Sequence, residues 1–167
     1  MTRGILLALL TVVGVAAPAA AQERPVYVAP NAPTDQPVYA YSDSAQARFF
    51  ALMEPHSAQA RATYPGAKAR FVKGLPAGQS FFAVTRLRDP DGRWEQVFIA
   101  VDRIEDGRIT GRIWNPLTVV RSFRRGAVHT FREAELVDWM ITRPDGTEEG
   151  NFVGKFIDEM QRSRAQP

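Results

Sequence analysis

An aspartate beside a tryptophan and a distant glutamate are the side chains best suited to acid–base chemistry. Asp138 directly precedes Trp139, and a carboxyl group at the mouth of an apolar pocket has its pKa raised by desolvation toward the range of a general acid or base. Glu95 could complete a carboxylate pair of the kind that hydrolases use. In the structural alternative, Trp139 packs in the core, Asp138 caps a turn or accepts backbone hydrogen bonds, and Glu95 lies on the surface. We favour this alternative and expect no enzymatic activity.

A second set of side chains could form a binding surface. Tryptophan rings stack on sugars and dominate many protein–protein contacts, and nearby amide and guanidinium groups add polar recognition. The candidate binding residues are Trp94, Trp114, Trp139, Asn115, Arg124 and Arg125. The competing expectation is that at least two of the three tryptophans pack in the core.

Other patterns of catalytic or metal-binding residues are missing from the sequence. His56 and His129 are the two histidines, and neither has a second ligand at the spacing of a metal site. We expect His56 to begin a helix and His129 to be a partly exposed structural residue on a strand. The chain has no cysteine, no Gly-x-Ser-x-Gly element and no glycine-rich phosphate loop. We therefore predict neither a metal nor a cofactor.

The charge balance argues against nucleic acid as a partner. The chain has 21 lysines and arginines against 18 acidic residues, a net charge of +3. Apart from Arg121, Arg124 and Arg125, the basic residues are scattered along the sequence. A nucleic-acid-binding protein normally concentrates them in a patch or stripe.

The N-terminal residues predict export. Arg3 precedes an apolar run at 4–15, and small residues at Ala19 and Ala21 suit a signal peptidase. The run of about a dozen residues is shorter than the ~20 that a membrane-spanning helix needs. We therefore predict a signal peptide at 1–21, cleaved after Ala21, and a periplasmic or secreted mature chain without a membrane span or disulfides.

The next residues predict a linker followed by one domain. Prolines are dense in 22–42, and this density favours extended chain over a packed element. A recognition tail anchored by the tyrosines of this segment is the alternative. Residues 43–160 are expected to form a single domain and 161–167 a disordered tail.

Helices are expected at both ends of this domain. A first helix is predicted from about residue 43 to Pro55, where the proline ends it, and a second over 56–64, interrupted at Pro65. Residues 151–160, which carry large apolar side chains four apart, predict a closing amphipathic helix.

Between the helices the pattern is typical of strands. Extended segments are predicted at 81–87, 94–102, 108–114, 117–123, 128–131 and 137–142, with a single helical turn at 132–135. Because both faces of 94–102 are apolar, this strand is expected to be central. Asp-Gly at 106–107 predicts a hairpin turn with positive φ angles. The predicted fold class is α+β, with N-terminal helices and a C-terminal helix packed on a curled, mainly antiparallel sheet of four to five strands.

Several of these stretches together resemble a known family. The similarity is carried by 60–65, 81–85, 95–101, 104–107, 109–111, 114–116 and 136–140. In these residues the chain resembles domain of unknown function 2314, the family of the bacterial YegJ-like proteins. It departs from that family at Gln96 and Phe98, where members usually carry histidine and tryptophan. The resemblance implies no catalytic residue, because the family supplies none.

These observations lead to three functional hypotheses. The first is a non-enzymatic binding or interaction module of the cell envelope, whose partner is another envelope protein or a glycan. The second is an envelope enzyme that uses Asp138 and Glu95 on a polar substrate. The third is a structural accessory domain.

Overall fold

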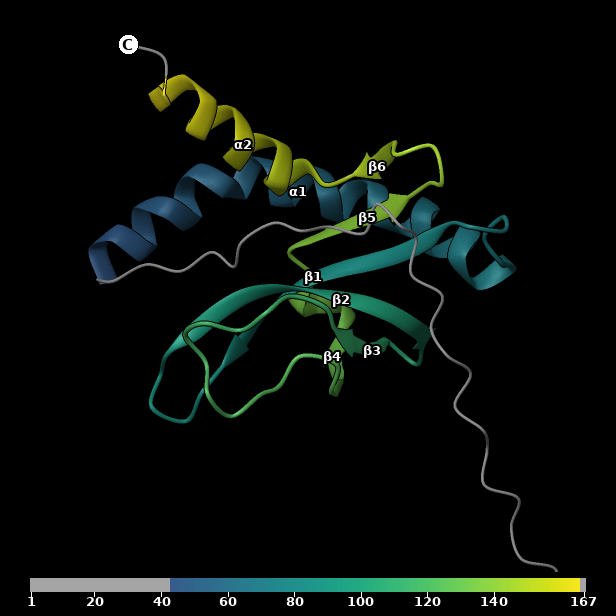
Figure 1. Ribbon diagram of the computed structural model, residues 1–167, viewed down its shortest axis with the longest axis horizontal. Helices are drawn as coiled ribbons and strands as arrows, with labels where there is room; N and C mark the ends of the chain where they lie inside the picture. The colour runs from purple at the N-terminus through teal and green to yellow at the C-terminus, as the bar shows by residue number, and fades with distance from the viewer. Residues whose placement is uncertain (1–42, 166–167) are drawn as a thin grey trace, which may run out of the picture.

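The computed structural model describes residues 43–165, which fold into two helices and one six-stranded sheet (Figure 1). The elements are α1 (Asp43–Lys73), β1 (Ser80–Arg88), β2 (Trp94–Glu105), β3 (Arg108–Ile113), β4 (Val128–Arg132), the 3₁₀ turn η1 (Glu133–Glu135), β5 (Asp138–Thr142), β6 (Glu148–Gly150) and α2 (Phe152–Ala165). The α+β class is confirmed. The predicted signal peptide and linker, and residues 166–167, lie outside the described residues.

The sheet is antiparallel throughout, in the order β4-β3-β2-β1-β5-β6. The prediction of four to five strands was too low, since β6 has only three residues and no apolar pattern of its own. The central position of β2 is confirmed, because it pairs with β1 and β3 and is buried on both faces along most of its length. The predicted turn at 106–107 is also confirmed, with φ of 48° at Asp106 and 70° at Gly107.

The N-terminal helical region is one helix, so the predicted breaks at Pro55 and Pro65 are wrong. A proline inside a helix removes one hydrogen bond and costs about 3 kcal/mol. Here the helix is held on both sides of its prolines by burial: Met53 and Ala60 are fully buried, and Ala67 nearly so. The indole Nε1 of Trp139 also donates to the carbonyl of Ala60 at 3.0 Å. Tertiary contacts thus outweigh the local preference.

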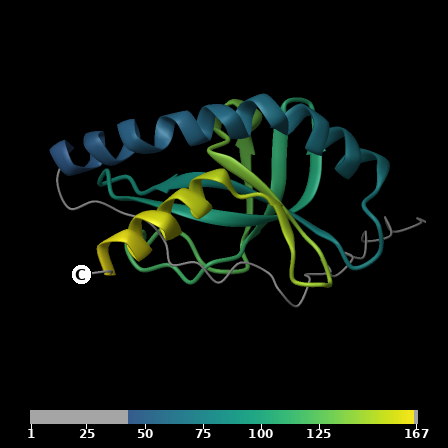
Figure 2. The same cartoon turned by 90° about the horizontal axis from the view of Figure 1, so that it is seen from above.

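Two apolar clusters lie on the two faces of the sheet. The Trp139 cluster is built around Trp139, Phe81, Ile99 and Phe131, and the Phe82 cluster around Phe82, Phe98, Met140 and Val153. Helix α1 contributes to both clusters, and α2 packs against its N-terminal half, where the ring of His56 stacks on Phe156. Figure 2 shows α1 running along the domain with α2 beside it.

Two further boundaries differ from the prediction. Helix α2 continues to Ala165, so residues 161–165 are helical and do not belong to a disordered tail. Residues 117–123 form a loop and not a strand, because the N–H groups of 118–122 donate to side chains, as described below. Neither described helix combines the length and apolar character that a membrane crossing requires.

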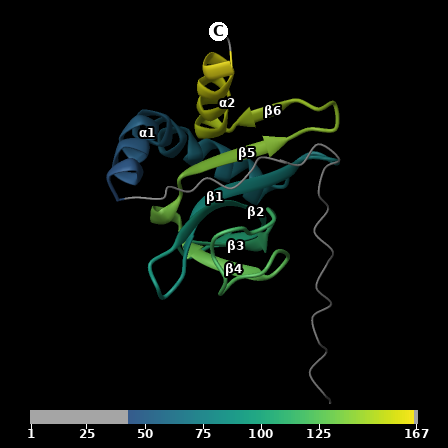
Figure 3. The same ribbon diagram turned by 60° about the vertical axis from the view of Figure 1, so that its left-hand side comes forward.

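Figure 3 shows the consequence of the curl of the sheet: β4 and β3 turn away from the helices, below β1 and β2. The 3₁₀ turn η1 connects β4 with β5, and the Thr85 hydroxyl of β1 donates to the carbonyl of Glu135 in this turn at 3.2 Å. The outer strand β4 is thereby brought back toward the C-terminal half of β1.

Candidate functional site

Glu95 is a buried anchor for the loop between β3 and β4. Its side chain is fully buried. Its carboxylate accepts the N–H groups of Thr118 at 2.9 Å, Val119 at 2.8 Å and Val120 at 3.0 Å, as well as the Thr118 hydroxyl at 3.2 Å. These bonds compensate the desolvation of the carboxylate. The expectation of a surface glutamate is corrected, and the role that these contacts support is structural.

Asp89 extends the same anchor. It is 4% exposed and accepts the N–H groups of Arg121 at 2.8 Å and Ser122 at 3.0 Å. The hydrogen bond from the Arg121 N–H is the main reason why the pKa of Asp89 lies below its ordinary value. Asp89 and Glu95 together accept five successive backbone N–H groups, from residue 118 to residue 122. We call this arrangement the carboxylate clamp.

Asp138 joins β5 to the start of α2. It is fully buried, and it accepts the N–H of Val153 at 2.7 Å and that of Trp139 at 2.7 Å. Gly150 and Asn151, with φ of 79° and 56°, turn the chain from β6 into α2 so that the Val153 N–H points at the carboxylate. Burial raises the pKa of Asp138 to about 7, although the two N–H groups and the charge of Lys155 act in the opposite direction.

The structure does not bring Asp138 and Glu95 together. Asp138 lies opposite Val84, a member of the Phe82 cluster, whereas Glu95 lies opposite Leu87, a member of the Trp139 cluster. The two carboxylates therefore project from opposite faces of the sheet. Each accepts backbone N–H groups, as in the structural alternative for Asp138.

The tryptophans do not form one surface either. Trp94 is 5% exposed and packs on Phe50, and Trp139 is 2% exposed. Asn115 is buried too, and its Oδ1 accepts the N–H of Phe98 at 2.5 Å. The expectation that at least two of the three tryptophans pack in the core is confirmed.

The third tryptophan lies at the surface, next to one of the predicted arginines. Trp114 is partly exposed, and the guanidinium of Arg125 lies 5.5 Å from the centre of its ring while its Nε donates to the Trp114 carbonyl at 2.9 Å. Arg124 is exposed in the same loop. Among the described residues, no group of histidine and acidic side chains could hold a metal ion.

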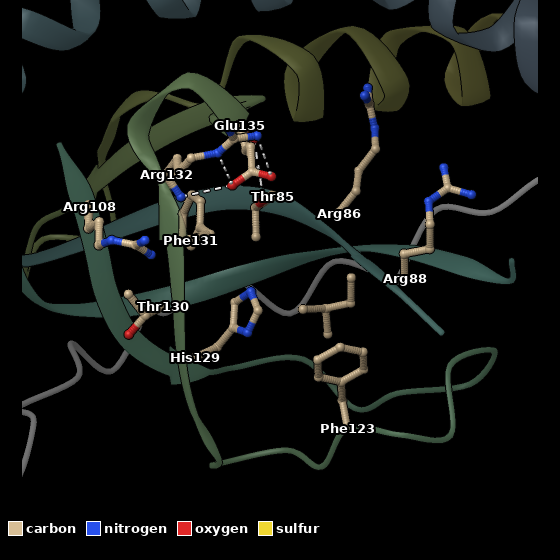
Figure 4. A pocket seen from close by; sticks show the side chains of 11 residues that line it. Thr85, Arg86, Arg88, Arg108, Phe123, His129, Thr130, Phe131, Arg132 and Glu135 are labelled. Carbon is tan, nitrogen blue, oxygen red and sulfur yellow. Dashed lines mark hydrogen bonds and ion pairs between the residues drawn. The ribbon is translucent and has the colours of Figure 1, made fainter. Parts of the chain in front are cut away.

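A basic pocket lies between β1, β4 and the loop that carries the clamp. It has a volume of about 350 Å³, and Figure 4 shows it from close by. Its lining consists of Thr85, Arg86, Leu87, Arg88, Arg108, Phe123, His129, Thr130, Phe131, Arg132 and Glu135. We call it the basic opening, because its lining includes four arginines and one carboxylate.

His129 lies at the centre of the basic opening (Figure 4). Its ring stacks on Phe131 with 5.9 Å between centroids and meets the edge of Phe123 at 5.7 Å. Burial lowers the pKa of His129, and the Glu135 carboxylate opposes this shift only in part. The imidazole is therefore neutral at pH 7, with one nitrogen to donate and one to accept a hydrogen bond.

The arginines form the rim of the opening. Arg86 and Arg88 point away from His129, and the Arg86 guanidinium lies over the ring of Phe50 at 4.0 Å (Figure 4). Arg108 and Arg132 lie directly opposite each other in the β3–β4 register, a position in which like charges repel. Glu135 partly offsets this repulsion, since its carboxylate accepts the Arg132 N–H at 2.8 Å and lies 3.4 Å from Arg132 Nε.

Sequence reasoning missed the basic opening because its residues come from four separate segments. The sequence indicates His129 as a partly exposed structural residue of a strand, which does not predict its place in a pocket, and it gives no reason to single out Arg86, Arg88, Arg108 or Arg132. The one available signal is the alternation of arginines at 86, 88, 108 and 112 with apolar or small residues along two strands.

Comparison of the chain with protein-family models, curated proteins and solved structures gives no match.

Replacing Glu95 tests the clamp. In Glu95→Gln an amide group takes the place of one carboxylate oxygen, so at least one buried N–H loses its acceptor, which costs about 1–3 kcal/mol. We expect the free energy of unfolding in urea to fall by that amount and the amide protons of 118–120 to exchange faster. Glu105→Gln, an exposed residue at the end of the same strand, is the control and should change stability by less than about 0.5 kcal/mol. Equal stability of the two variants would contradict the clamp.

Asp138 should make stability depend on pH. Because its pKa in the folded chain is about 7, against 3.8 ordinarily, the folded state binds more protons between these values, and its stability falls as pH rises from about 4 to 7. One such group contributes a slope of up to about 1.4 kcal/mol per pH unit. Urea unfolding at several pH values should show this slope in the natural chain and in the Asp158→Asn control, and a flatter one in Asp138→Asn. An unchanged slope in Asp138→Asn would refute the raised pKa.

Proposed function

We propose that this chain is an exported, non-enzymatic binding module of the cell envelope that binds an acidic group of its partner at the arginine rim of the basic opening. The observation that carries the proposal is that the lining of one pocket contains four arginines and a half-buried histidine with a single carboxylate, and that two of these arginines, Arg108 and Arg132, lie directly opposite each other at its rim. Guanidinium groups are suited to carboxylate and phosphate recognition, because they present several donors in a fixed plane.

The surroundings of His129 support binding of a group that is only partly polar. Phe123 and Phe131 flank the imidazole, and Thr85 and Thr130 add hydroxyl groups to the lining. A pocket with apolar walls and a few polar groups is the usual form of a binding site. The charges of the rim would attract an acidic partner, and the aromatic walls would bury its apolar neighbours.

The second hypothesis, an enzyme acting through Asp138 and Glu95, has less support. These two carboxylates lie on opposite faces of the sheet and accept backbone N–H groups. Neither lines the basic opening.

A structural accessory domain is the third hypothesis, and a lack of binding to any acidic ligand would favour it. Membership of the domain of unknown function 2314 family stays a prediction from the residues quoted above.

Binding can be tested with two defined probes, an oligoglutamate peptide and an acidic oligosaccharide of galacturonate. NMR titration should move the signals of His129 and of the residues around it, and the affinity should fall as salt is raised. In Arg108→Ala we expect affinity to fall about three- to tenfold, corresponding to roughly 0.7–1.4 kcal/mol. Arg162→Ala, an exposed arginine of α2, is the control and should bind normally. Shifts that map elsewhere, or no binding of either probe, would refute the proposal.

Export can be tested separately. The full-length chain produced in a bacterium with a periplasm should appear in the periplasmic or secreted fraction, and mass spectrometry should show Gln22 as its first residue. Replacing Ala19 and Ala21 with bulky residues should block cleavage, because the peptidase accepts small side chains there. Cytoplasmic retention of an intact chain would contradict export while leaving the binding proposal untouched.

A further inference from the structure

The edge strand β4 has backbone groups available for pairing. It is the last strand of the sheet in the described part of the chain. The Ile113 N–H donates to Ala127 and the Glu133 N–H to Gly107, so in the antiparallel register His129 and Phe131 also exchange hydrogen bonds with β3. The N–H and C=O groups of Val128 and Thr130 consequently point outward, where no described strand pairs with them.

The two sides of β4 differ in chemistry. On one side lie the exposed residues Val128, Thr130 and Arg132, next to Arg112, Thr110 and Arg108 of β3. The hydroxyls of Thr110 and Thr130 are 2.9 Å apart at the centre of this ladder. On the other side lie His129 and Phe131. Figure 4 shows His129 and Thr130 leaving the strand in opposite directions.

From this arrangement we infer that the partner is an extended peptide segment that adds to β4 as a seventh strand and alternates acidic with apolar residues. Its acidic side chains lie beside the arginines of the ladder, and its apolar side chains face the aromatic wall of the basic opening. The inference rests on the proposed function and names the class of partner for that site. Strand addition obtains affinity from main-chain hydrogen bonds and specificity from alternate side chains.

The positive charges beside β4 favour an acidic strand over a second copy of this chain. A second copy of the chain would place the arginines of one β4 edge against those of another, and charged edges normally prevent such self-pairing. An acidic strand would instead have its side chains about 5 Å from those of β4, next to Arg132, where they would offset the repulsion between Arg132 and Arg108. The exposed side chain of Val128, which is 53% accessible, would be covered by the same strand.

The test compares capped peptides of one composition by calorimetry and NMR. The first alternates glutamate and valine, the second has the same residues in two blocks, and two more carry N-methyl groups on the glutamate amides or on the valine amides. Only one set of amides in an added strand faces β4, so one N-methyl peptide should bind at least about tenfold more weakly than the other, as expected for the loss of one or two hydrogen bonds. The block peptide should also bind more weakly.

A protein variant tests the edge itself. The Thr130 N–H points outward, so Thr130→Pro removes no hydrogen bond to β3, and proline is tolerated on an edge strand in this position. It should unfold at a similar temperature to the matched control Thr130→Val but lose the alternating peptide, which the control should keep. If Thr130→Pro does not fold, the pair of N-methyl peptides decides the question alone.

The outcomes separate the two proposals. Equal affinity for all four peptides, or galacturonate binding that Thr130→Pro leaves unchanged while no peptide binds, would overturn strand addition and leave the anion site standing. Absence of binding by every acidic probe would overturn both. Arg108→Ala should weaken the alternating peptide by the same factor as oligoglutamate, whereas Thr130→Pro should weaken the alternating peptide alone.

Discussion

Five successive backbone N–H groups donate to two buried carboxylates, and this clamp decides where the sheet ends. A buried carboxylate without donors and a buried N–H without an acceptor are each costly, and here each satisfies the other. Because the N–H groups of 118–122 are used in this way, the segment cannot pair as a strand. β4 therefore begins only at Val128 and stays at the edge, and Phe123 becomes a wall of the basic opening.

Asp138, on the other face of the sheet, is also a buried carboxylate that accepts backbone N–H groups. It accepts an N–H from the first turn of α2, where the helix has no internal acceptor, and fixes that helix to β5. Asp138 accepts two backbone N–H groups. Desolvation outweighs these two hydrogen bonds and raises the pKa of Asp138. A raised pKa at a buried aspartate can thus report a helix anchor as well as a catalytic acid.

Local signals predicted the parts of the fold that local energies decide. The Asp-Gly turn at 106–107 and the apolar residues on both faces of β2 gave correct elements, because a positive φ angle or a buried face constrains a few neighbouring residues. The breaks predicted at Pro55 and Pro65 failed because burial against distant strands outweighs the cost of each proline. The strand predicted at 117–123 failed for a related reason, since its hydrogen-bond acceptors are the side chains of Glu95 and Asp89, more than twenty residues earlier.

The candidate site was less predictable than the fold, because the curl of the sheet brings its residues together from separate segments. Arg86 and Arg132 lie far apart in the sequence, and their approach depends on the curl that carries β4 back toward β1. The side chains that draw attention in the sequence, Asp138, Glu95 and two of the tryptophans, are buried and hold the structure together. The rim arginines instead lie at the surface of the fold, where removing one charge alters stability little. Binding can therefore be separated from folding by mutation at Arg108, whereas a change at Glu95 alters both, because the clamp positions one wall of the opening.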